Sequence, residues 1–221
     1  MDALAIISIG GLPGAGKTTQ SSRLAEATGG RLFVAGKYLR DEAKRQTELG
    51  ETFYRYSSLG LPCPDEVICA ILRDPLDRAL SANDGIVLLD GFPKSGQQLD
   101  FLEGRSAVPL TALLYLEVPT EELVARLTRR RTCEQCGMAS DLESATCQSC
   151  GARIRQRYDD SRRIVEQRLL NYRDREEKFK ALMSGRGRAL HVDGSRTSDI
   201  VHREFVDVCE AITSGSFPPA G

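Results

Sequence analysis

The sequence predicts an α/β fold in which one parallel β-sheet carries helices on both faces. Three observations indicate this fold class. Short apolar runs, typical of strands buried on both faces, recur along the chain. Stretches with helical periodicity lie between these runs, and a glycine-rich loop joins the first run to the first helical stretch. We interpret the 221 residues as one domain with inserts, residues 1–221.

The expected strands are short and separated by helical stretches. We place the strands at residues 4–9, 31–34, 86–89, 111–117 and 189–192. A helical stretch over residues 18–27 follows the first strand and stops at Gly29. Pro119 opens a later helix, with Glu121 and Glu122 in its first turn, where the helix dipole favours acidic side chains.

The longest predicted helix covers residues 161–183 and carries one apolar stripe. The stripe consists of Val165, Leu169, Tyr172, Phe179 and Met183. Gly185 lies just beyond this helix and is expected to end it. The last residues, 213–221, are rich in Ser, Pro and Gly and are expected to fray.

The loop after the first strand matches the phosphate-binding pattern G-x-x-x-x-G-K-[ST] at residues 11–18. Its glycines let backbone N–H groups surround an anion, and the helix that follows adds a favourable dipole. In such a loop Lys17 reaches the β- and γ-phosphates, and Thr18 can ligate Mg²⁺. The alternative is a chance glycine-rich turn, which the order of strand, loop and helix disfavours.

A second phosphate-transfer element is the apolar run at residues 86–89 with Asp90 directly after it. This pattern predicts a buried strand whose carboxylate emerges at the carboxyl end, beside the phosphate-binding loop. A carboxylate there can hold Mg²⁺ or its water shell. The alternative is an aspartate that caps a turn with Gly91 and Pro93.

Two cysteine pairs, Cys133-x-x-Cys136 and Cys147-x-x-Cys150, have the spacing of a metal site. Each pair places two thiolates within reach of one ion, and four thiolates leave no open coordination position. The sequence therefore predicts a structural metal, with Zn²⁺ as the default and iron as the other option. Two disulfides or four free thiols are the alternatives. The remaining cysteines, Cys63, Cys69 and Cys209, are interpreted as buried apolar side chains.

Composition narrows the class of protein. Hydrophobic residues make up 41% of the chain and charged residues 28%, and the net charge is −1. This charge provides no overall field to attract nucleic acid or an anionic membrane. No apolar run approaches the roughly 20 residues of a membrane helix. The first strand begins almost directly after Met1, so we expect no targeting peptide and a cytoplasmic protein. We also expect a monomer.

Five motifs occur in a fixed order along the chain. They are residues 11–20, 35–40, 90–94 with Gln98, 126–131 followed by the first cysteine pair, and 157–160 with Arg168. Together they resemble the adenylate kinase family, and the resemblance covers residues 6–208. It implies a P-loop NTPase-type core, a monophosphate-binding helical insert at 36–67 and a small zinc-ribbon lid at 127–157. It also implies ATP with Mg²⁺ and a nucleoside monophosphate as substrates.

The resemblance also implies roles for single residues on the donor side and at the transferring group. The ATP-binding residues are Gly11, Gly14, Ala15, Gly16, Lys17, Thr18, Thr19 and Arg126. Arg126 is expected to stack on the adenine. The catalytic residues are Lys17, Asp90, Arg130, Arg157 and Arg168. Arginine suits this chemistry because it is always charged and its fork binds phosphate oxygens in pairs.

On the acceptor side the resemblance implies a mixed polar and apolar set. The acceptor-binding residues are Ala35, Lys37, Arg40, Leu61, Cys63, Gly91, Lys94, Gln98, Arg157 and Arg168. Within this set, Arg40 and Lys94 hold the acceptor phosphate and Gln98 reads the base.

Three acceptor positions depart from the family pattern. Ala35 stands where adenosine-specific members usually have threonine, Lys37 replaces an acid, and Lys94 replaces an arginine. We hypothesise that Lys37 and Lys94 together serve the acceptor's anionic group, the alternative for Lys37 being a solvated surface lysine. Gln98 favours a purine, whereas Ala35 argues against strict recognition of AMP.

These motifs predict a nucleoside monophosphate kinase that transfers the γ-phosphoryl group of Mg-ATP to AMP. One alternative is a kinase for another phosphorylated acceptor, such as CMP, UMP, a deoxynucleoside monophosphate or a specialised metabolite. Another is a nucleotide sensor without useful turnover, which the intact charged residues disfavour. A zinc-ribbon nucleic-acid binder is disfavoured by the net charge and by the lack of an aromatic-rich basic face. Four further arginines are expected at the surface: Arg129, Arg131, Arg162 and Arg163.

Overall fold

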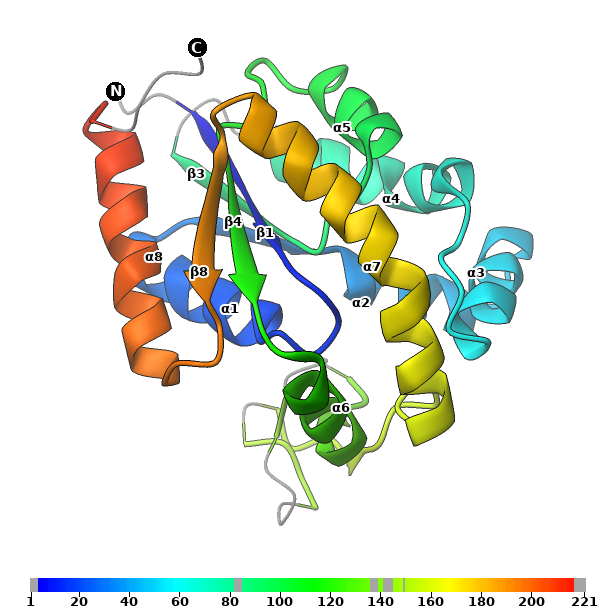
Figure 1. Cartoon of the computed structure of the whole chain (residues 1–221). Coiled ribbons are helices and arrows are strands. Elements are labelled where there is room, and N and C mark those ends of the chain that lie inside the picture. The colour runs from blue at the N-terminus through cyan, green and yellow to red at the C-terminus, as the bar shows by residue number, and fades with distance from the viewer. Residues whose placement is uncertain (1–3, 82–84, 136–138, 141–144, 149, 217–221) are drawn as a thin grey trace.

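The computed structural model describes residues 4–81, 85–135, 139–140, 145–148 and 150–216. Its core is a five-stranded sheet in the order β2-β3-β1-β4-β8, and all neighbouring strands are parallel (Figure 1). The strands are β1 (Ala5–Gly10), β2 (Arg31–Val34), β3 (Ile86–Asp90), β4 (Ala112–Glu117) and β8 (Ala189–Asp193). The predicted parallel α/β fold is confirmed, and each strand boundary lies within one residue of its expected position.

Eight helices surround this sheet in the part of the chain that the structure describes. They are α1 (Lys17–Thr28), α2 (Ala35–Lys44), α3 (Glu48–Ser58), α4 (Asp65–Leu80), α5 (Gly96–Glu103), α6 (Thr120–Arg129), α7 (Arg162–Gly185) and α8 (Ser198–Thr213). The sequence analysis expected α1, α6 and α7 individually and the others only as helical stretches between strands. Gly29 ends α1 in the left-handed region, with φ 66°, as glycine readily does.

The two faces of the sheet carry separate hydrophobic cores, because successive side chains of a strand point to opposite faces. Ile6 of β1 packs with α4, α5 and the C-terminal half of α7. Its neighbour Ile7 packs with α1, α6, α8 and the N-terminal half of α7. Figure 1 shows α8 and α7 on opposite sides of the strands. Burial on both faces explains why the strands are near-continuous apolar runs.

Helix α7 confirms most of its predicted stripe and adds one residue to it. Val165, Leu169, Phe179 and Met183 are buried. Tyr172 is only half-buried, and the acidic side chain of Glu176 lies on the same face, 1% exposed. Sequence periodicity did not predict this buried acid. The helix ends at Gly185, close to the expected position.

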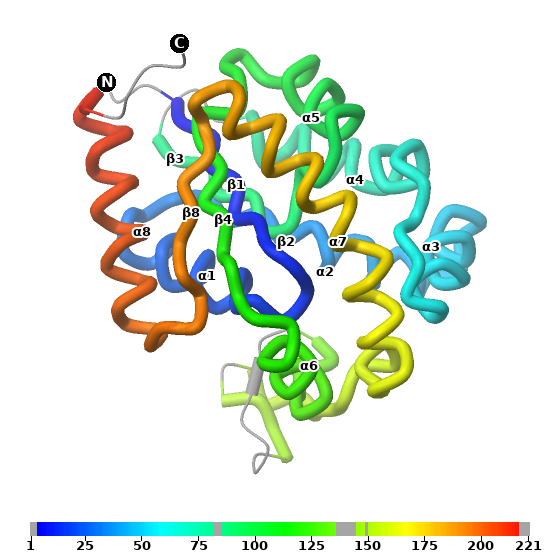
Figure 2. The backbone as a smooth tube through the Cα atoms, viewed as in Figure 1, coloured from blue at the N-terminus to red at the C-terminus, as the bar shows by residue number. Residues whose placement is uncertain are grey.

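A second, smaller sheet lies beyond the carboxyl ends of β4 and β8 (Figure 2). It is antiparallel, in the order β6-β5-β7, with β5 at Arg131–Cys133, β6 at Ala139–Ser140 and β7 at Ile154–Arg155. These strands fall within the residues 127–157 that the sequence assigned to a lid. Cys136 lies outside the described residues, as does the end of the chain after residue 216.

Among the described residues, no helix combines the length and the apolar character needed to span a membrane.

Candidate active site

The phosphate-binding loop connects β1 to α1 and wraps around the amine of Lys17. Gly14 has φ 88°, and a Cβ there would lie 2.8 Å from Leu127 Cγ, so this position requires glycine. Lys17 Nζ donates hydrogen bonds to the carbonyl oxygens of Gly11, at 2.7 Å, and Leu12, at 2.9 Å. Burial, and then the charge of Lys94, lowers the pKa of Lys17 to about 7. An anion bound in this loop would therefore raise the pKa of Lys17 again, because its negative charge stabilises the protonated amine.

Asp90 emerges beside this loop, as the sequence predicted. Strands β1 and β3 are paired, with Ile9 opposite Asp90. Thr18 Oγ1 donates a hydrogen bond to Asp90 Oδ2 at 2.6 Å, and Asp90 is only 4% exposed. A hydroxyl and a carboxylate held together are hard oxygen ligands of the kind that Mg²⁺ prefers. These two residues therefore fit a magnesium site beside the loop.

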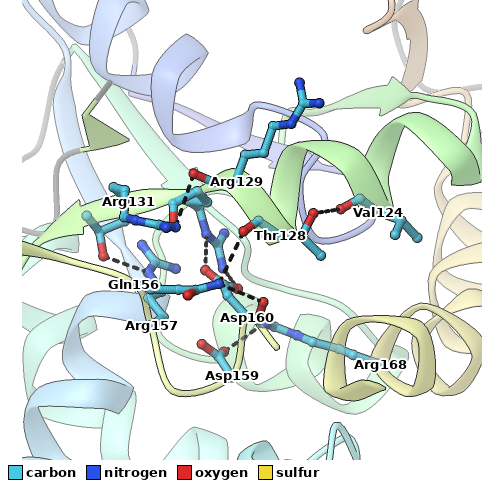
Figure 3. A network of polar contacts seen from close by, with 11 residues as sticks. Val124, Thr128, Arg129, Arg131, Gln156, Arg157, Asp159, Asp160 and Arg168 are labelled. Carbon is cyan, nitrogen blue, oxygen red and sulfur yellow. Dashed lines mark hydrogen bonds and ion pairs between the residues drawn. The ribbon is translucent and has the colours of Figure 1, made fainter. Parts of the chain in front are cut away.

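A cluster of arginines faces the loop, and two buried aspartates hold it in place (Figure 3). Arg130 forms a two-pronged contact with Asp160, with Nε at 2.8 Å and Nη2 at 2.5 Å from the carboxylate oxygens. Arg168 Nη1 donates to Asp159 Oδ2 at 2.7 Å. Burial alone would raise the pKa of Asp159, but Arg168 and the other arginines bring it below its usual value. Both aspartates belong to the motif at residues 157–160, but the sequence analysis assigned neither of them a role.

Arg157 is the member of the arginine cluster that contacts the small sheet. Its Nε donates to Thr132 Oγ1 at 3.3 Å, so it is tied to β5. Burial, and then the nearby charges of Arg40 and Arg130, lower the pKa of Arg157 to about 8. The two aspartates offset only part of this positive charge, and bound phosphates would stabilise the charged form of Arg157 further.

One cleft of about 630 Å³ brings these groups together. The predicted site residues that line it are Gly14, Ala15, Gly16, Lys17, Thr18, Thr19, Ala35, Arg40, Leu61, Cys63, Asp90, Gly91, Lys94, Gln98, Arg126, Arg130, Arg157 and Arg168. Gly11 is buried and is not among the lining residues. Arg129 and Arg131, expected at the surface, also line the cleft. Arg162 and Arg163 are exposed, as expected.

Lys37 does not reach the cleft. Its Nζ lies 3.3 Å from Asp41 Oδ2, and 44% of its side chain is exposed. Lys94 instead forms an ion pair with the buried Glu176 of α7. The two lysines therefore have separate acidic partners, an arrangement that favours the solvated alternative for Lys37 over joint action with Lys94. The solvated alternative for Lys37 fits the structure.

Two further charged residues line or border the cleft near Lys94 and Gln98. Arg175 of α7 lines it and pairs with Asp65, the first residue of α4. Sequence reasoning missed both. Their only sequence signal is that Arg175 lies on the long helix close to Arg168, which the motif identified.

The segment 127–157, which the sequence analysis expected to form a lid, contains a cluster of cysteine thiols. Cys133, Cys147 and Cys150 have all their sulfur atoms within 4.8 Å of one another, and the sulfurs of Cys133 and Cys150 are 3.4 Å apart. Tetrahedral zinc with Zn–S bonds of about 2.3 Å needs sulfurs roughly 3.8 Å apart. The three described thiols therefore fit one zinc ion, and Cys136, the fourth predicted ligand, lies outside the described residues.

Comparison with known proteins agrees with this geometry. The family model described as adenylate kinase matches residues 9–183. An adenylate kinase of Haloarcula marismortui is 38% identical, and the match covers 94% of this chain and 98% of that relative. An adenylate kinase of Archaeoglobus fulgidus is 33% identical over 92% of this chain and 97% of its own length. For one of Halobacterium salinarum these values are 35%, 91% and 94%.

The fold and the loop define a P-loop phosphotransferase: a parallel sheet that presents a phosphate-binding loop and several cations in one cleft. Within that class, the chain belongs to the adenylate kinase family. It is therefore an enzyme that acts on nucleotides, as the resemblance in the sequence implied.

Proposed function

We propose that this chain catalyses the reaction of Mg-ATP with AMP to give two molecules of ADP. In this reaction the bond between the γ-phosphorus and the β,γ-bridging oxygen breaks, and a phosphate oxygen of AMP forms the new bond. The observation that carries the proposal is the single cleft in which Lys17 and the cluster of Arg130, Arg157 and Arg168 meet. Four cations around one point suit the several phosphates of two nucleotides.

On the donor side, the loop and the N-terminus of α1 would hold the β- and γ-phosphates. Binding requires Lys17 Nζ to exchange its contacts with Gly11 and Leu12 for phosphate oxygens. Arg126, which donates to the carbonyl of Gly194 at 3.0 Å and lines the cleft, would stack on the donor base, as the family resemblance implies. Magnesium near Thr18 and Asp90 would neutralise phosphate charge when bound.

At the transferring group, Arg130 and Arg168 would supply cations whose positions are already fixed by buried aspartates. Such preorganised charges stabilise the transition state because they need little reorganisation as charge develops on the equatorial oxygens. On the acceptor side, Arg40 and Lys94 would bind the phosphate and Gln98 the purine. These roles follow from the family resemblance and from the position of each residue in the cleft.

We further propose that residues 36–67 and 127–157 move over the core when substrates bind. The two segments contact each other directly. Lys44 Nζ donates to the carbonyl of Glu134 at 3.0 Å, and the hydroxyl of Ser57 lies 2.7 Å from that of Tyr158, the residue directly after the second segment. Closure of this kind would exclude water that could otherwise hydrolyse ATP. All the proposed catalytic residues come from one chain, which supports a monomer.

We also propose a structural zinc ion in the lid and a cytoplasmic location, where thiolates stay reduced. The wild-type protein should contain one zinc ion per chain, and Cys133→Ser should contain less. The variant's melting temperature should fall by roughly 5–10 °C, because binding of a structural metal is coupled to folding. Elemental analysis and thermal melting measure both effects. Cys69→Ser, at another buried thiol, is the control and should keep its zinc. Wild-type protein that is fully stable without metal would contradict this proposal.

A screen of acceptors tests the proposed function directly. Coupled measurement of ADP formation with Mg-ATP should rank AMP first among the common nucleoside and deoxynucleoside monophosphates. Ala35 and Lys94, which depart from the family pattern, make CMP, UMP or another phosphorylated metabolite the second candidate. A higher kcat/KM for one of these acceptors than for AMP would replace AMP in the proposal. Absence of transfer to every acceptor would favour a nucleotide sensor.

A further inference from the structure

The side-chain amide of Gln98 is held at both ends in one direction. Its Oε1 accepts a hydrogen bond from the backbone N–H of Lys94 at 2.9 Å. Its Nε2 donates to Asp65 Oδ1 at 2.6 Å. Reversing the amide would place an oxygen against the Asp65 carboxylate and an NH₂ group against the Lys94 N–H. Both new contacts would be repulsive, so the direction of the amide is fixed twice.

Asp65 is itself held by residues from two other parts of the chain. Ser95, the N-cap of α5, donates its hydroxyl to Asp65 Oδ2 at 2.7 Å. Arg175 of α7 forms an ion pair with Asp65 Oδ1 and also donates to the carbonyl of Lys94 at 3.3 Å. The side chain of Asp65 is 12% exposed. Arg175 therefore holds a carboxylate oxygen of Asp65 next to Gln98 Nε2, whether or not a ligand occupies the cleft.

Each end of the fixed amide keeps one further bonding position. Nε2 has a second hydrogen, and Oε1 has a second lone pair. Gln98 lines the cleft, so a base there meets a donor and an acceptor in a set order. A 6-aminopurine presents a donor at N6 and an acceptor at N1, whereas a 6-oxopurine presents an acceptor at O6 and a donor at N1. In a common binding pose, only one of these two orders is complementary to Gln98.

We propose that Asp65, supported by Arg175, is a positioning residue that makes the acceptor site select 6-aminopurine over 6-oxopurine monophosphates. It acts through Gln98 and need not touch the substrate. The inference rests on the proposed function, because it assumes that this part of the cleft holds the acceptor base. It names the discriminating feature, the direction of one amide, and the residues that set it.

The test compares AMP with IMP, which differ only in the 6-substituent and the proton on N1. The wild-type enzyme should have the higher kcat/KM for AMP. Asp65→Ala removes the acceptor and leaves Arg175 to attract Gln98 Oε1, so the preference should fall about tenfold, or about 1.4 kcal/mol. The change should appear in the KM of the acceptor and not in that of ATP. Asp65→Asn, whose amide oxygen Arg175 would hold in place, should keep the preference.

The adjacent acid provides a matched control. Glu66 Oε1 accepts a hydrogen bond from Gln97 Nε2 at 2.9 Å. This exposed acid–amide pair resembles the Asp65–Gln98 pair, but neither of its residues lines the cleft. Glu66→Ala should leave the AMP-to-IMP ratio unchanged. Gln98→Leu should abolish the preference, and adding Asp65→Ala to it should change nothing more, since Asp65 acts only through Gln98.

An unchanged ratio in Asp65→Ala would overturn the inference, as would an equal loss in Asp65→Asn, which would assign the effect to charge. If Asp65→Ala does not fold, the double variant Asp65→Asn with Arg175→Met replaces it, because without the Arg175 guanidinium the asparagine amide is no longer oriented. If the wild type phosphorylates no purine monophosphate, the proposed function fails. Calorimetric binding of AMP and IMP to the same variants then decides this inference separately.

Discussion

Replacing Lys17 with methionine should reduce kcat by about a thousandfold while the protein stays folded. Methionine keeps most of the apolar volume of the side chain and removes the amine that the loop surrounds. Because that amine would neutralise the β- and γ-phosphates as charge moves between them, its loss removes transition-state stabilisation of the size seen for preorganised donors. Steady-state ADP formation measures the effect. Activity within tenfold of the wild type would contradict the role assigned to Lys17.

The lowered pKa of Lys17 supplies a second readout that depends on binding alone. The folded pKa is about 7, below the ordinary value of 10.5. At pH 8 the amine is therefore mostly neutral without ligand, and phosphates would raise its pKa again. Binding of ATP at pH 8 should take up protons, which calorimetry detects as an enthalpy that varies with the buffer. Lys17→Met should remove that uptake, whereas Lys178→Met, at an exposed lysine, should not.

The same pKa has a defined consequence for stability. The unfolded chain binds more protons than the folded chain between the folded pKa of about 7 and the unfolded value of 10.5. The contribution of Lys17 to the free energy of unfolding therefore becomes more favourable as pH rises through this window. Lys17→Met should remove that contribution.

The sheet and the donor site could be predicted from the sequence because their signals are local. Strands buried on both faces appear as apolar runs, and the phosphate-binding loop is one continuous motif between a strand and a helix. The position of Asp90 followed from the same reasoning, since the carboxyl ends of parallel strands meet at one edge. Thr18 and Asp90 indeed lie within hydrogen-bond distance.

The acceptor side was harder to predict because its contacts join distant parts of the chain. Lys94 and Glu176 are 82 residues apart, and Asp65 and Arg175 are 110 apart. No spacing rule connects such residues, and a single sequence shows only that they are charged. Glu176 falls on the apolar stripe of α7, where an acid breaks the pattern. That break is the one signal from which a buried partner could have been inferred.

Helical geometry bears on the role that the family resemblance implied for Lys37. Helix α2 buries Ala35 and Leu39, which are four positions apart and lie on one face. A residue two positions after Ala35 is rotated by about 200° from it, on the opposite face. Lys37 therefore points away from the core and pairs with Asp41 instead of reaching the cleft. The direction of the helix thus disfavours the acceptor role that the family position suggested for Lys37.

Half-buried arginines held by buried aspartates are the second feature with a large expected effect. Arg168 pairs with Asp159 at 2.7 Å, and 20% of its side chain is exposed. Its guanidinium also lies over the ring of Tyr172, with 5.8 Å between its carbon and the ring centroid. The ion pair and the ring fix the direction of the fork towards the cleft. Such a fixed cation contributes to catalysis because it is placed before the charge develops.

Arg168→Met should therefore lower kcat by about a hundredfold to a thousandfold, with a smaller change in the KM for ATP. Arg162→Met, at an exposed arginine near the start of the same helix, is the matched control and should keep full activity. Removing Arg168 also leaves Asp159 buried without its main partner, so the melting temperature should fall as well. Assays well below that temperature separate the two effects. If Arg168→Met has the wild-type kcat under those conditions, Arg168 serves stability alone. Partial activity in Arg168→Lys would instead show that the positive charge acts in catalysis even without the forked guanidinium.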